Sequence, residues 1–214
     1  MKKLFEGVYK ESNRIFTKNL IPGRKVYNER LLKKGGVEYR SWNPYRSKMA
    51  AAILKGLKNF PIKKGEKILY LGVASGTTAS HFSDIIGKGG IIYGVEVSFK
   101  PMKNFIKLCE ERKNMLPVLA DANKPEMYEA IVEDAGVLYQ DIAQKNQVEI
   151  FLKNMDKFEP QHGIIMVKAR SIDISMKPNR IFERVKKEIG KHFNIKEAIK
   201  LAPYAKDHIA IVVE

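Results

Sequence analysis

The amino-acid sequence predicts an α/β fold in which helices cover both faces of a mainly parallel sheet. The first supporting observation is the segment of residues 68–80, where an apolar run leads into two glycines and then into a helical pattern. The second is the regular alternation of strand-like and helix-like apolar patterns in the rest of the chain. The third is that charged residues follow several of the expected strands, because parallel strands place such residues along one edge of their sheet.

Residues 1–45 are expected to form a small β-rich N-terminal subdomain, and residues 46–214 the α/β domain. Alternating apolar residues predict short strands at residues 4–10 and 13–17, with a turn at residues 11–13, and a last strand at residues 37–42. The pairs Pro22-Gly23 and Gly35-Gly36 mark further turns. Because no flexible linker follows, we expect the subdomain to pack directly on the domain after it.

A helix is expected at residues 48–58, where Ser47 can cap the first turn. Its apolar stripe consists of Met49, Ala52, Ile53 and Leu57. Strands are then predicted at residues 67–71, 91–96, 115–119, 137–141, 164–167, 195–201 and 209–213. Helices are predicted at residues 78–86, 101–113, 144–157 and 178–192, with a short one near residues 125–132.

The glycine turn after the first of these strands predicts a nucleotide site. Gly72 and Gly76 let the backbone approach a ligand, and the helix beyond them offers free N–H groups. A P-loop would need a lysine after the second glycine, but Thr77 and Thr78 follow it, which argues against ATP or GTP. The dinucleotide fingerprint is absent as well, because the two glycines stand four residues apart rather than two. The spacing fits the glycine loop of a methyltransferase better.

Acidic residues at the next strand ends indicate what the nucleotide is. Glu96 stands twenty residues after Gly76, where a carboxylate can accept both hydroxyls of an adenosine ribose. Asp121, followed by Ala122, is placed to meet the adenine amino group. Each carboxylate alone could equally be a loop cap, but their placement at successive strand ends favours a ligand site.

Basic charge is concentrated in the N-terminal third of the chain. Residues 1–64 contain 17 Lys and Arg against 4 Asp and Glu, whereas the other 150 residues contain 22 against 20. A one-sided basic surface is typical of a protein that binds nucleic acid. The alternative is a solvated basic face, or the lysine enrichment of a thermophile.

Cysteine content and hydropathy limit the class of protein. The single cysteine, Cys109, excludes an internal disulfide framework, and its place in a helical pattern predicts a buried structural thiol. The sequence has neither an apolar run long enough to span a membrane nor the apolar stretch of a signal peptide, so we expect a cytoplasmic protein and no membrane partner. His81, His162 and His192 show no paired metal-ligand spacing, and no metal site is expected.

Five composite segments resemble the fibrillarin family, and the resemblance extends over essentially the whole chain. They are W-N-P-Y-R-S-K-M-A-A-A-I-L at residues 42–54, L-Y-L-G-V-A-S-G-T-T-A-S-H at 69–81, Y-Q-D-I-A-Q at 139–144, V-K-A-R-S-I-D at 167–173 and P-Y-A-K-D-H at 203–208. Long motifs in the same order are far more specific than one glycine turn. Eukaryotic members carry a Gly- and Arg-rich N-terminal extension, so this sequence is similar to the shorter archaeal form.

The resemblance implies a class I, Rossmann-like methyltransferase sheet with an antiparallel C-terminal strand. It also implies transfer of a methyl group from S-adenosylmethionine to ribose 2′-hydroxyls in rRNA, with tRNA as a further substrate class. The Lys-Asp-Lys-His tetrad of the family corresponds here to Lys48, Asp141, Lys168 and His208. The cofactor site implied by the family and the strand ends comprises Gly72, Ser75, Gly76, Thr77, Thr78, Glu96, Asp121, Ala122, Asp141 and Gln144.

The resemblance further implies a catalytic subunit of a box C/D ribonucleoprotein, in which base pairing with a guide RNA selects the target RNA. The other implied partners are a Nop-domain scaffold protein and a kink-turn-binding protein of the ribosomal type. The sequence contains no RRM, KH or zinc-knuckle pattern with which to read bases itself. Trp42 and Tyr45 could stack on a base, but core packing explains them at least as well.

The chemistry of 2′-O-methylation suits the tetrad, because a ribose hydroxyl is a poor nucleophile that must be oriented and deprotonated. Lys168 in its neutral form could take that proton, or Asp141 could act as the base or hold the lysine in place. Lys48 and His208 would orient the nucleotide or stabilise charge; without the resemblance, a surface lysine and a loop histidine would be the simpler interpretation. Two other functions stay open, a nicotinamide-dependent oxidoreductase and a non-catalytic RNA-binding or assembly subunit.

Overall fold

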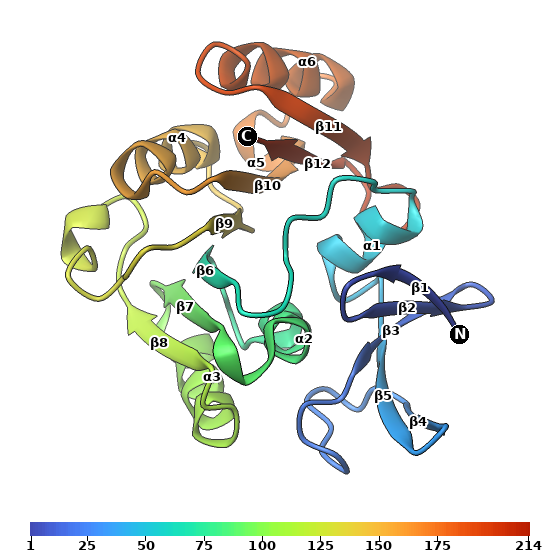
Figure 1. The fold of residues 1–214 in the computed structure, drawn as a ribbon. Helices are drawn as coiled ribbons and strands as arrows, with labels where there is room; N and C mark the ends of the chain where they lie inside the picture. Colours follow the sequence, from blue (N-terminus) through green and yellow to red (C-terminus); the bar gives the residue numbers. More distant parts are fainter.

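The computed structural model describes residues 1–214 and contains two β-sheets (Figure 1). The larger sheet has seven strands in the order β11-β12-β10-β9-β6-β7-β8. All of its neighbouring pairs are parallel except those made by β12, which runs antiparallel to both β10 and β11. This arrangement confirms the mainly parallel sheet with an antiparallel C-terminal strand. The strands are β6 (Lys67–Leu71), β7 (Ile91–Glu96), β8 (Met115–Leu119), β9 (Val137–Gln140), β10 (His162–Lys168), β11 (Ile195–Lys200) and β12 (His208–Val213).

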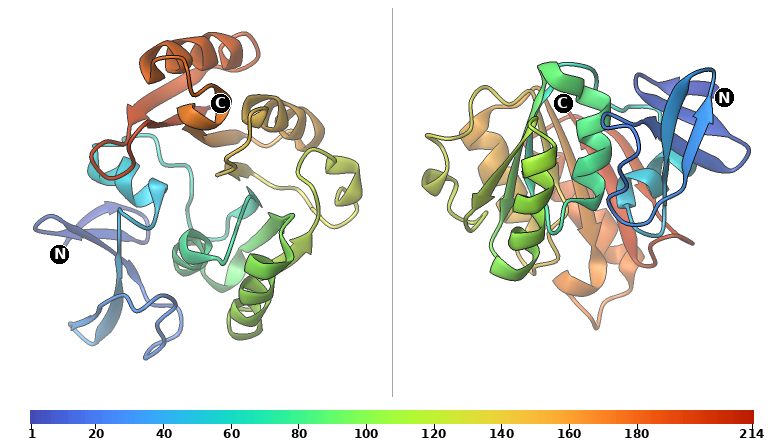
Figure 2. Two further views of the ribbon diagram at one scale, coloured as in Figure 1. Left: turned by 180° about the vertical axis from the view of Figure 1, so that it is seen from behind. Right: turned by 90° about the horizontal axis from the view of Figure 1, so that it is seen from below.

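Helices cover both faces of this sheet because alternate strand residues point to opposite sides. Ile68 and Tyr70 of β6 belong to one hydrophobic cluster, together with the apolar faces of the first three helices. Leu69 and Leu71 belong to a second cluster, beneath α4 and α6 on the other side. Figure 2 shows the two helical layers. The α-helices are α1 (Lys48–Leu54), α2 (Thr77–Ile86), α3 (Phe99–Glu111), α4 (Gln147–Phe158), α5 (Ala169–Ile172) and α6 (Pro178–Ile189), and the short 3₁₀ helices are η1 (Gly87–Gly89) and η2 (Pro125–Met127).

All the predicted helices are present, but their bounds differ from the sequence prediction by one to five residues, and the short one near residues 125–132 is the 3₁₀ helix η2. The first helix ends at Leu54 rather than at residue 58, because Gly56 adopts a left-handed conformation (φ 99°). The helix expected from residue 144 begins at Gln147. Gln144 consequently lies in the loop between β9 and α4, at the edge where the parallel strands end.

The smaller N-terminal sheet is antiparallel, with strand order β1-β2-β3-β5-β4. Its strands are β1 (Lys2–Phe5), β2 (Val8–Glu11), β3 (Arg14–Lys18), β4 (Leu31–Lys34) and β5 (Val37–Trp42). The prediction of one strand over residues 4–10 is wrong. Gly7 has a positive φ of 72°, which allows a tight turn that divides this segment into β1 and β2. The sequence prediction also missed β4.

The two sheets share one core. Val8, Ile15 and Trp42 from the N-terminal sheet lie in the same hydrophobic cluster as Ile68 and Phe82. The N-terminal subdomain therefore packs directly on the α/β domain, as expected from the absence of a flexible linker. The domain boundary at residue 45 stays a prediction. None of the helices combines the length and the apolar character that a membrane span requires.

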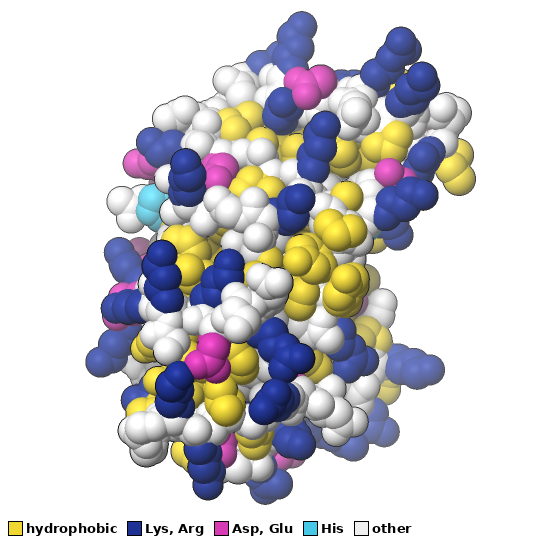
Figure 3. All heavy atoms as spheres, turned by 90° about the vertical axis from the view of Figure 1, so that its right-hand side faces the viewer, with side chains coloured by type: hydrophobic (Ala, Val, Ile, Leu, Met, Phe, Trp, Pro, Cys, Tyr) yellow, Lys and Arg dark blue, Asp and Glu magenta, His cyan; other side chains and the backbone are white.

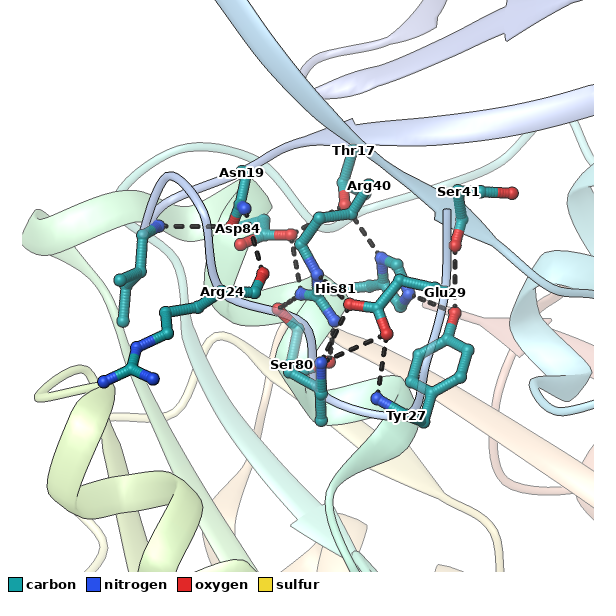
Figure 4. Close-up of polar contacts among 12 residues, drawn as sticks. Thr17, Asn19, Arg24, Tyr27, Glu29, Arg40, Ser41, Ser80, His81 and Asp84 are labelled. Atoms are coloured by element: carbon teal, nitrogen blue, oxygen red, sulfur yellow. Dashed lines mark hydrogen bonds and ion pairs between the residues drawn. The ribbon is translucent and has the colours of Figure 1, made fainter. Parts of the chain in front are cut away.

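Buried polar side chains join the N-terminal sheet to α2 (Figure 4), and Arg112 joins α2 to the end of α3. The Arg40 guanidinium, which is not exposed at all, binds Glu29 Oε1 through Nε at 2.6 Å and Asp84 Oδ2 through Nη1 at 2.9 Å. The other Asp84 oxygen accepts a hydrogen bond from Arg112 Nη1 at 2.7 Å. Two arginines and two carboxylates thus neutralise one another between the two sheets.

His81 completes the polar cluster between the sheets. Thr17 donates its hydroxyl proton to Asp84, so the 2.8 Å contact between Thr17 Oγ1 and His81 Nδ1 assigns the ring proton to Nδ1. The Tyr27 hydroxyl lies 2.7 Å from Nε2. Burial, and then the charges of Arg40 and Arg112, hold the pKa of His81 well below its usual range, so the imidazole is neutral.

Candidate active site

The turn after β6 brings the chain against the end of β9. Gly72 has a positive φ of 77°, and a Cβ atom at this position would lie only 2.7 Å from the carbonyl oxygen of Asp141. Glycine is therefore required both by the backbone conformation and by the close approach of the two segments. The contact fixes Asp141, one residue beyond β9, beside the glycine turn.

A cavity of about 270 Å³ lies at the carboxyl ends of the parallel strands, as the fold predicts for a ligand site. Six of the residues predicted for the cofactor site line it: Gly72, Glu96, Asp121, Ala122, Asp141 and Gln144. The sequence prediction missed further lining residues from the same turns. Ala74, Val97 and Ile142 are among them, and only their adjacency to predicted residues could have indicated them.

Carboxylates at the cavity are held by backbone and side-chain donors. Glu96 accepts hydrogen bonds from the N–H groups of Ala74 (3.0 Å) and Ser98 (2.9 Å), one at each oxygen. Asp121 accepts two bonds through Oδ1, from the backbone N–H and the side-chain amide of Asn123, both at 2.9 Å. These bonds lower the pKa of Asp121, so its carboxylate is ionised with Oδ2 free of protein donors.

The other four residues predicted for the cofactor site lie outside this cavity. Gly76 precedes α2 in a left-handed conformation, and a Cβ there would lie 2.7 Å from the side chains of Phe105 and Leu108, so its role in the fold is close packing of α2 on α3. Ser75 and Thr77 line a separate depression. Thr78 is buried and donates a hydrogen bond to Ser47 Oγ at 2.9 Å.

The bond from Thr78 supports the start of α1, where Lys48 is the first residue. Ser47 caps this helix, because its Oγ accepts a hydrogen bond from the N–H of Ala50. Lys48 Nζ then reaches Asp141 Oδ1 at 2.7 Å, and the two side chains are 29% and 18% exposed. The capped helix thus points an ammonium group at the end of β9.

Lys168 and His208 come from β10 and β12, the two strands beyond β9 in the sheet. They are directly opposite each other in the antiparallel pair of β10 and β12. Burial lowers the pKa of His208; the bond from Nδ1 to the carbonyl of Lys206 opposes this shift, and the charges of Lys48 and Lys168 reinforce it. The carboxylate of Asp141 opposes the shift as well, so Lys48, Asp141 and Lys168 all lie within electrostatic reach of His208, whose lowered pKa leaves a neutral imidazole at neutral pH.

Gln147 is a positioning residue that the sequence prediction missed. Its fully buried amide accepts a hydrogen bond from the N–H of Lys168 at 2.9 Å and donates one to the carbonyl of the same residue at 3.2 Å. Both backbone groups of Lys168 are thereby fixed just where β10 ends. The only feature of the sequence that could have indicated this role is a polar glutamine on the buried face of α4.

Comparisons with known proteins show which family the chain is similar to. The profile of the fibrillarin family matches residues 1–214. A fibrillarin-like rRNA/tRNA 2′-O-methyltransferase of Thermococcus sibiricus is 51% identical over 219 aligned residues, which cover 99% of this chain and 97% of the relative.

Two solved structures are similar over most of their length. The Aeropyrum pernix fibrillarin with natively bound S-adenosyl-L-methionine has a TM-score of 0.86 and 45% identity, covering 94% of this chain and 89% of its own. The structure of a fibrillarin/Nop5p complex matches with a TM-score of 0.91 and 44% identity, covering 99% of both chains. The chain belongs to the fibrillarin family.

Proposed function

We propose that the chain is an RNA-guided methyltransferase that transfers the methyl group of S-adenosylmethionine to ribose 2′-hydroxyls of rRNA and tRNA. The observation that carries the proposal is the position of Asp141. Asp141 lines the cavity of about 270 Å³, and its carboxylate pairs with the Lys48 ammonium at 2.7 Å. One residue thus joins a nucleotide-sized cavity to a cluster of proton-handling side chains.

The cavity fits the adenosine part of S-adenosylmethionine. Glu96, fixed at the end of β7, offers acceptor oxygens to two ribose hydroxyls, and the free oxygen of Asp121 can accept from the adenine amino group. Val97, Ala122 and Ile142 supply apolar surface for the adenine ring. The same ligand is bound in the related Aeropyrum pernix fibrillarin, which supports the assignment. We propose roles at the edge of this site for Ser75, Gly76, Thr77 and Thr78 through the shape of the turn.

Proton removal is the chemical task that falls to the tetrad. Bound S-adenosylmethionine supplies a methyl group that is already activated by its sulfonium. Asp141 is engaged as the partner of Lys48, so we assign the proton of the 2′-hydroxyl to the neutral amine form of Lys168, whose backbone is fixed by Gln147. Lys48 keeps Asp141 in place, and the neutral ring of His208 offers Nε2 to the ribose.

A guide RNA and partner proteins would supply target selection. A related fibrillarin is known in a complex with Nop5p, which supports a Nop-domain scaffold as a partner of this chain. We also propose a box C/D guide RNA and a kink-turn-binding protein as partners, because the basic N-terminal third suits an RNA environment. We propose the cytoplasm as the site of action, in keeping with the single buried thiol.

The proposal is tested by methyl transfer in a reconstituted complex with scaffold protein, kink-turn-binding protein, guide RNA and target RNA. Labelled methyl groups are expected at one target nucleotide, and a 2′-deoxy substitution at that nucleotide should abolish incorporation. Unchanged incorporation into the deoxy substrate would exclude the 2′-hydroxyl as the acceptor. Binding of S-adenosylhomocysteine but not NAD, measured by calorimetry, would separate this function from that of a nicotinamide-dependent oxidoreductase.

Replacing Glu96 with alanine is expected to weaken S-adenosylhomocysteine binding by about 10- to 100-fold, because two ribose hydroxyls lose a charged acceptor. RNA binding by the assembled complex should stay within about twofold of wild type, since Glu96 lies at the cavity and not on the basic surface. Calorimetry and filter binding measure the two affinities. Glu66→Ala, at the opposite end of the sheet before β6, is the matched control. Equal losses of both affinities in the Glu96 variant would contradict the ribose assignment.

A further inference from the structure

A second cavity lies between the N-terminal sheet and the loop that leads into α1. It has a volume of about 420 Å³. We call it the arginine cavity, because Arg14, Arg30 and Arg46 all line it. None of the residues proposed for catalysis or cofactor binding lines this cavity. Figure 3 shows the side of the molecule on which Figure 1 places the N-terminal sheet, where lysine and arginine side chains outnumber acidic ones.

The three arginines are available to an anionic ligand. Their side chains are exposed, and none of them forms an ion pair within the protein. Glu29 is the one acidic residue of the lining, but its carboxylate is buried and bound to Arg40 at 2.6 Å. The cavity therefore carries positive charge that no ion pair of the three arginines neutralises. A planar guanidinium group can donate two parallel hydrogen bonds to two oxygens of one phosphate.

Two contacts with Tyr27 fix the position of the Arg46 guanidinium at the cavity. Its Nη1 donates a hydrogen bond to the carbonyl of Tyr27 at 3.0 Å, and its guanidinium lies 5.5 Å from the centre of the Tyr27 ring. The remaining donors of the guanidinium face no protein acceptor. Trp42, which also lines the cavity, is 1% exposed, and its indole N–H has no acceptor in the protein. This N–H is inaccessible to solvent, so Trp42 contributes wall surface to the cavity and not a donor for a ligand.

Two tyrosines connect the arginine cavity to the candidate active site. Tyr45 is 70% exposed, and its ring meets that of Tyr204 edge to face at 5.2 Å. Both rings line the cavity. Tyr45 precedes Lys48 by three residues, and Tyr204 precedes His208 by four. The contact between the two rings therefore joins the loop before Lys48 to the loop before His208.

We propose that the arginine cavity binds backbone phosphates of the RNA strand beside the target nucleotide, while Tyr45 stacks on a neighbouring base. The inference rests on the proposed function, since it names a subsite for the same RNA substrate. Phosphate contacts fix the register of a strand without reading its sequence, as a guide-directed enzyme requires. An exposed aromatic ring adds a stacking platform that tolerates any base. Together they hold the ribose at the tetrad while the guide RNA selects it.

The double variant Arg14→Gln/Arg30→Gln tests the proposal in the complete reconstituted complex. We expect the half-saturating concentration of target RNA to rise about tenfold, with the maximal single-turnover rate and S-adenosylhomocysteine binding unchanged. The salt dependence of RNA binding should flatten by a slope of about one per lost phosphate contact. Tyr45→Ala should also raise the half-saturating concentration about tenfold, but with an unchanged salt slope.

Lys63→Gln/Lys64→Gln is the matched control, because it removes the same charge from exposed residues just before β6, at the opposite edge of the sheet. It should leave all these values unchanged. Neutral methylphosphonates beside the target nucleotide should weaken binding to the wild type and add no further loss to Arg14→Gln/Arg30→Gln.

Three results would overturn the proposal. The arginine variant could behave like the lysine control, the methylphosphonate and arginine effects could simply add, or the variant could lose assembly with the scaffold protein in the absence of RNA. The last result would assign the cavity to a protein partner. Absence of methyl transfer by the wild-type complex would instead contradict the proposed function itself, so the two failures are distinguishable.

Discussion

Replacing Lys168 with methionine is expected to lower the single-turnover rate of methyl transfer by about 10²- to 10⁴-fold, the usual contribution of a general base. The 2′-hydroxyl must lose its proton as the new C–O bond forms, and methionine keeps the length of the side chain without a proton acceptor. The backbone of residue 168 stays fixed by Gln147, so the fold should not change. Rapid-quench assays with a labelled methyl donor measure the rate, and S-adenosylhomocysteine binding should stay at the wild-type value.

Two further variants distinguish a proton acceptor from a positive charge at this position. Lys168→Arg keeps the charge, but a guanidinium stays protonated and cannot take the proton. If Lys168 is the base, Lys168→Arg should be as slow as Lys168→Met. Recovery of most of the activity by the arginine variant would contradict that role.

Asp141→Asn completes the comparison. It retains the shape of the side chain and removes the ion pair with Lys48. A fast Lys168→Arg enzyme together with an inactive Asp141→Asn enzyme would assign the proton to the carboxylate.

The parallel strands of the larger sheet could be predicted from the sequence because each is a short, largely apolar run. The bounds of β7 and β8 are those expected from the sequence. The same logic placed Glu96, Asp121 and Asp141 at successive strand ends, and the structure brings all three to one cavity. Parallel strands impose this outcome, since their carboxyl ends must lie along one edge of the sheet.

The directions of the side chains in the glycine turn could not be predicted from the sequence. Consecutive residues of a turn point in different directions, so Gly72 lines the cavity while Thr78 faces Ser47. Trp42 and Tyr45 show the same limit. Both could equally have been stacking or core residues, yet Trp42 is buried against the ring of His81 at 4.9 Å and Tyr45 is exposed. Cys109 is buried as expected, and burial raises the pKa of its thiol to about 12, which makes it an inert core residue.

Removing the charge of Asp84 is expected to destabilise the whole protein more than any surface substitution. Asp84 accepts from Arg40 through one oxygen and from Arg112 through the other, and all three side chains are essentially inaccessible to water. Asp84→Asn keeps the size of the side chain but leaves the buried Arg40 with Glu29 as its one carboxylate partner and the buried Arg112 with none. Loss of one partner of a buried ion pair costs about 3–5 kcal/mol. Urea denaturation followed by circular dichroism measures the change in the free energy of unfolding.

The control is Glu111→Gln, which removes the same charge from an exposed pair. Glu111 lies 3.8 Å from Arg24, and the two side chains are 49% and 66% exposed. Solvent screening limits such a pair to less than about 1 kcal/mol. A loss of similar size in both variants would show that the buried pairs contribute no more than a surface contact.

Combining Asp84→Asn with Arg112→Met tests the cause of the loss, because the double variant no longer buries the Arg112 charge. If an uncompensated charge causes the destabilisation, the double variant should be more stable than the sum of the two single losses predicts, by about 1–3 kcal/mol. Simple addition of the two losses would instead indicate lost packing. Asp84 of α2 and Arg112 after α3 both belong to the α/β domain, whereas Arg40 comes from β5, so the same cycle with Arg40→Met in place of Arg112→Met measures how strongly the N-terminal sheet is held to the α/β domain. That attachment fixes the arginine cavity relative to Lys48, so a large coupling would explain why so many charges are buried where the two sheets meet.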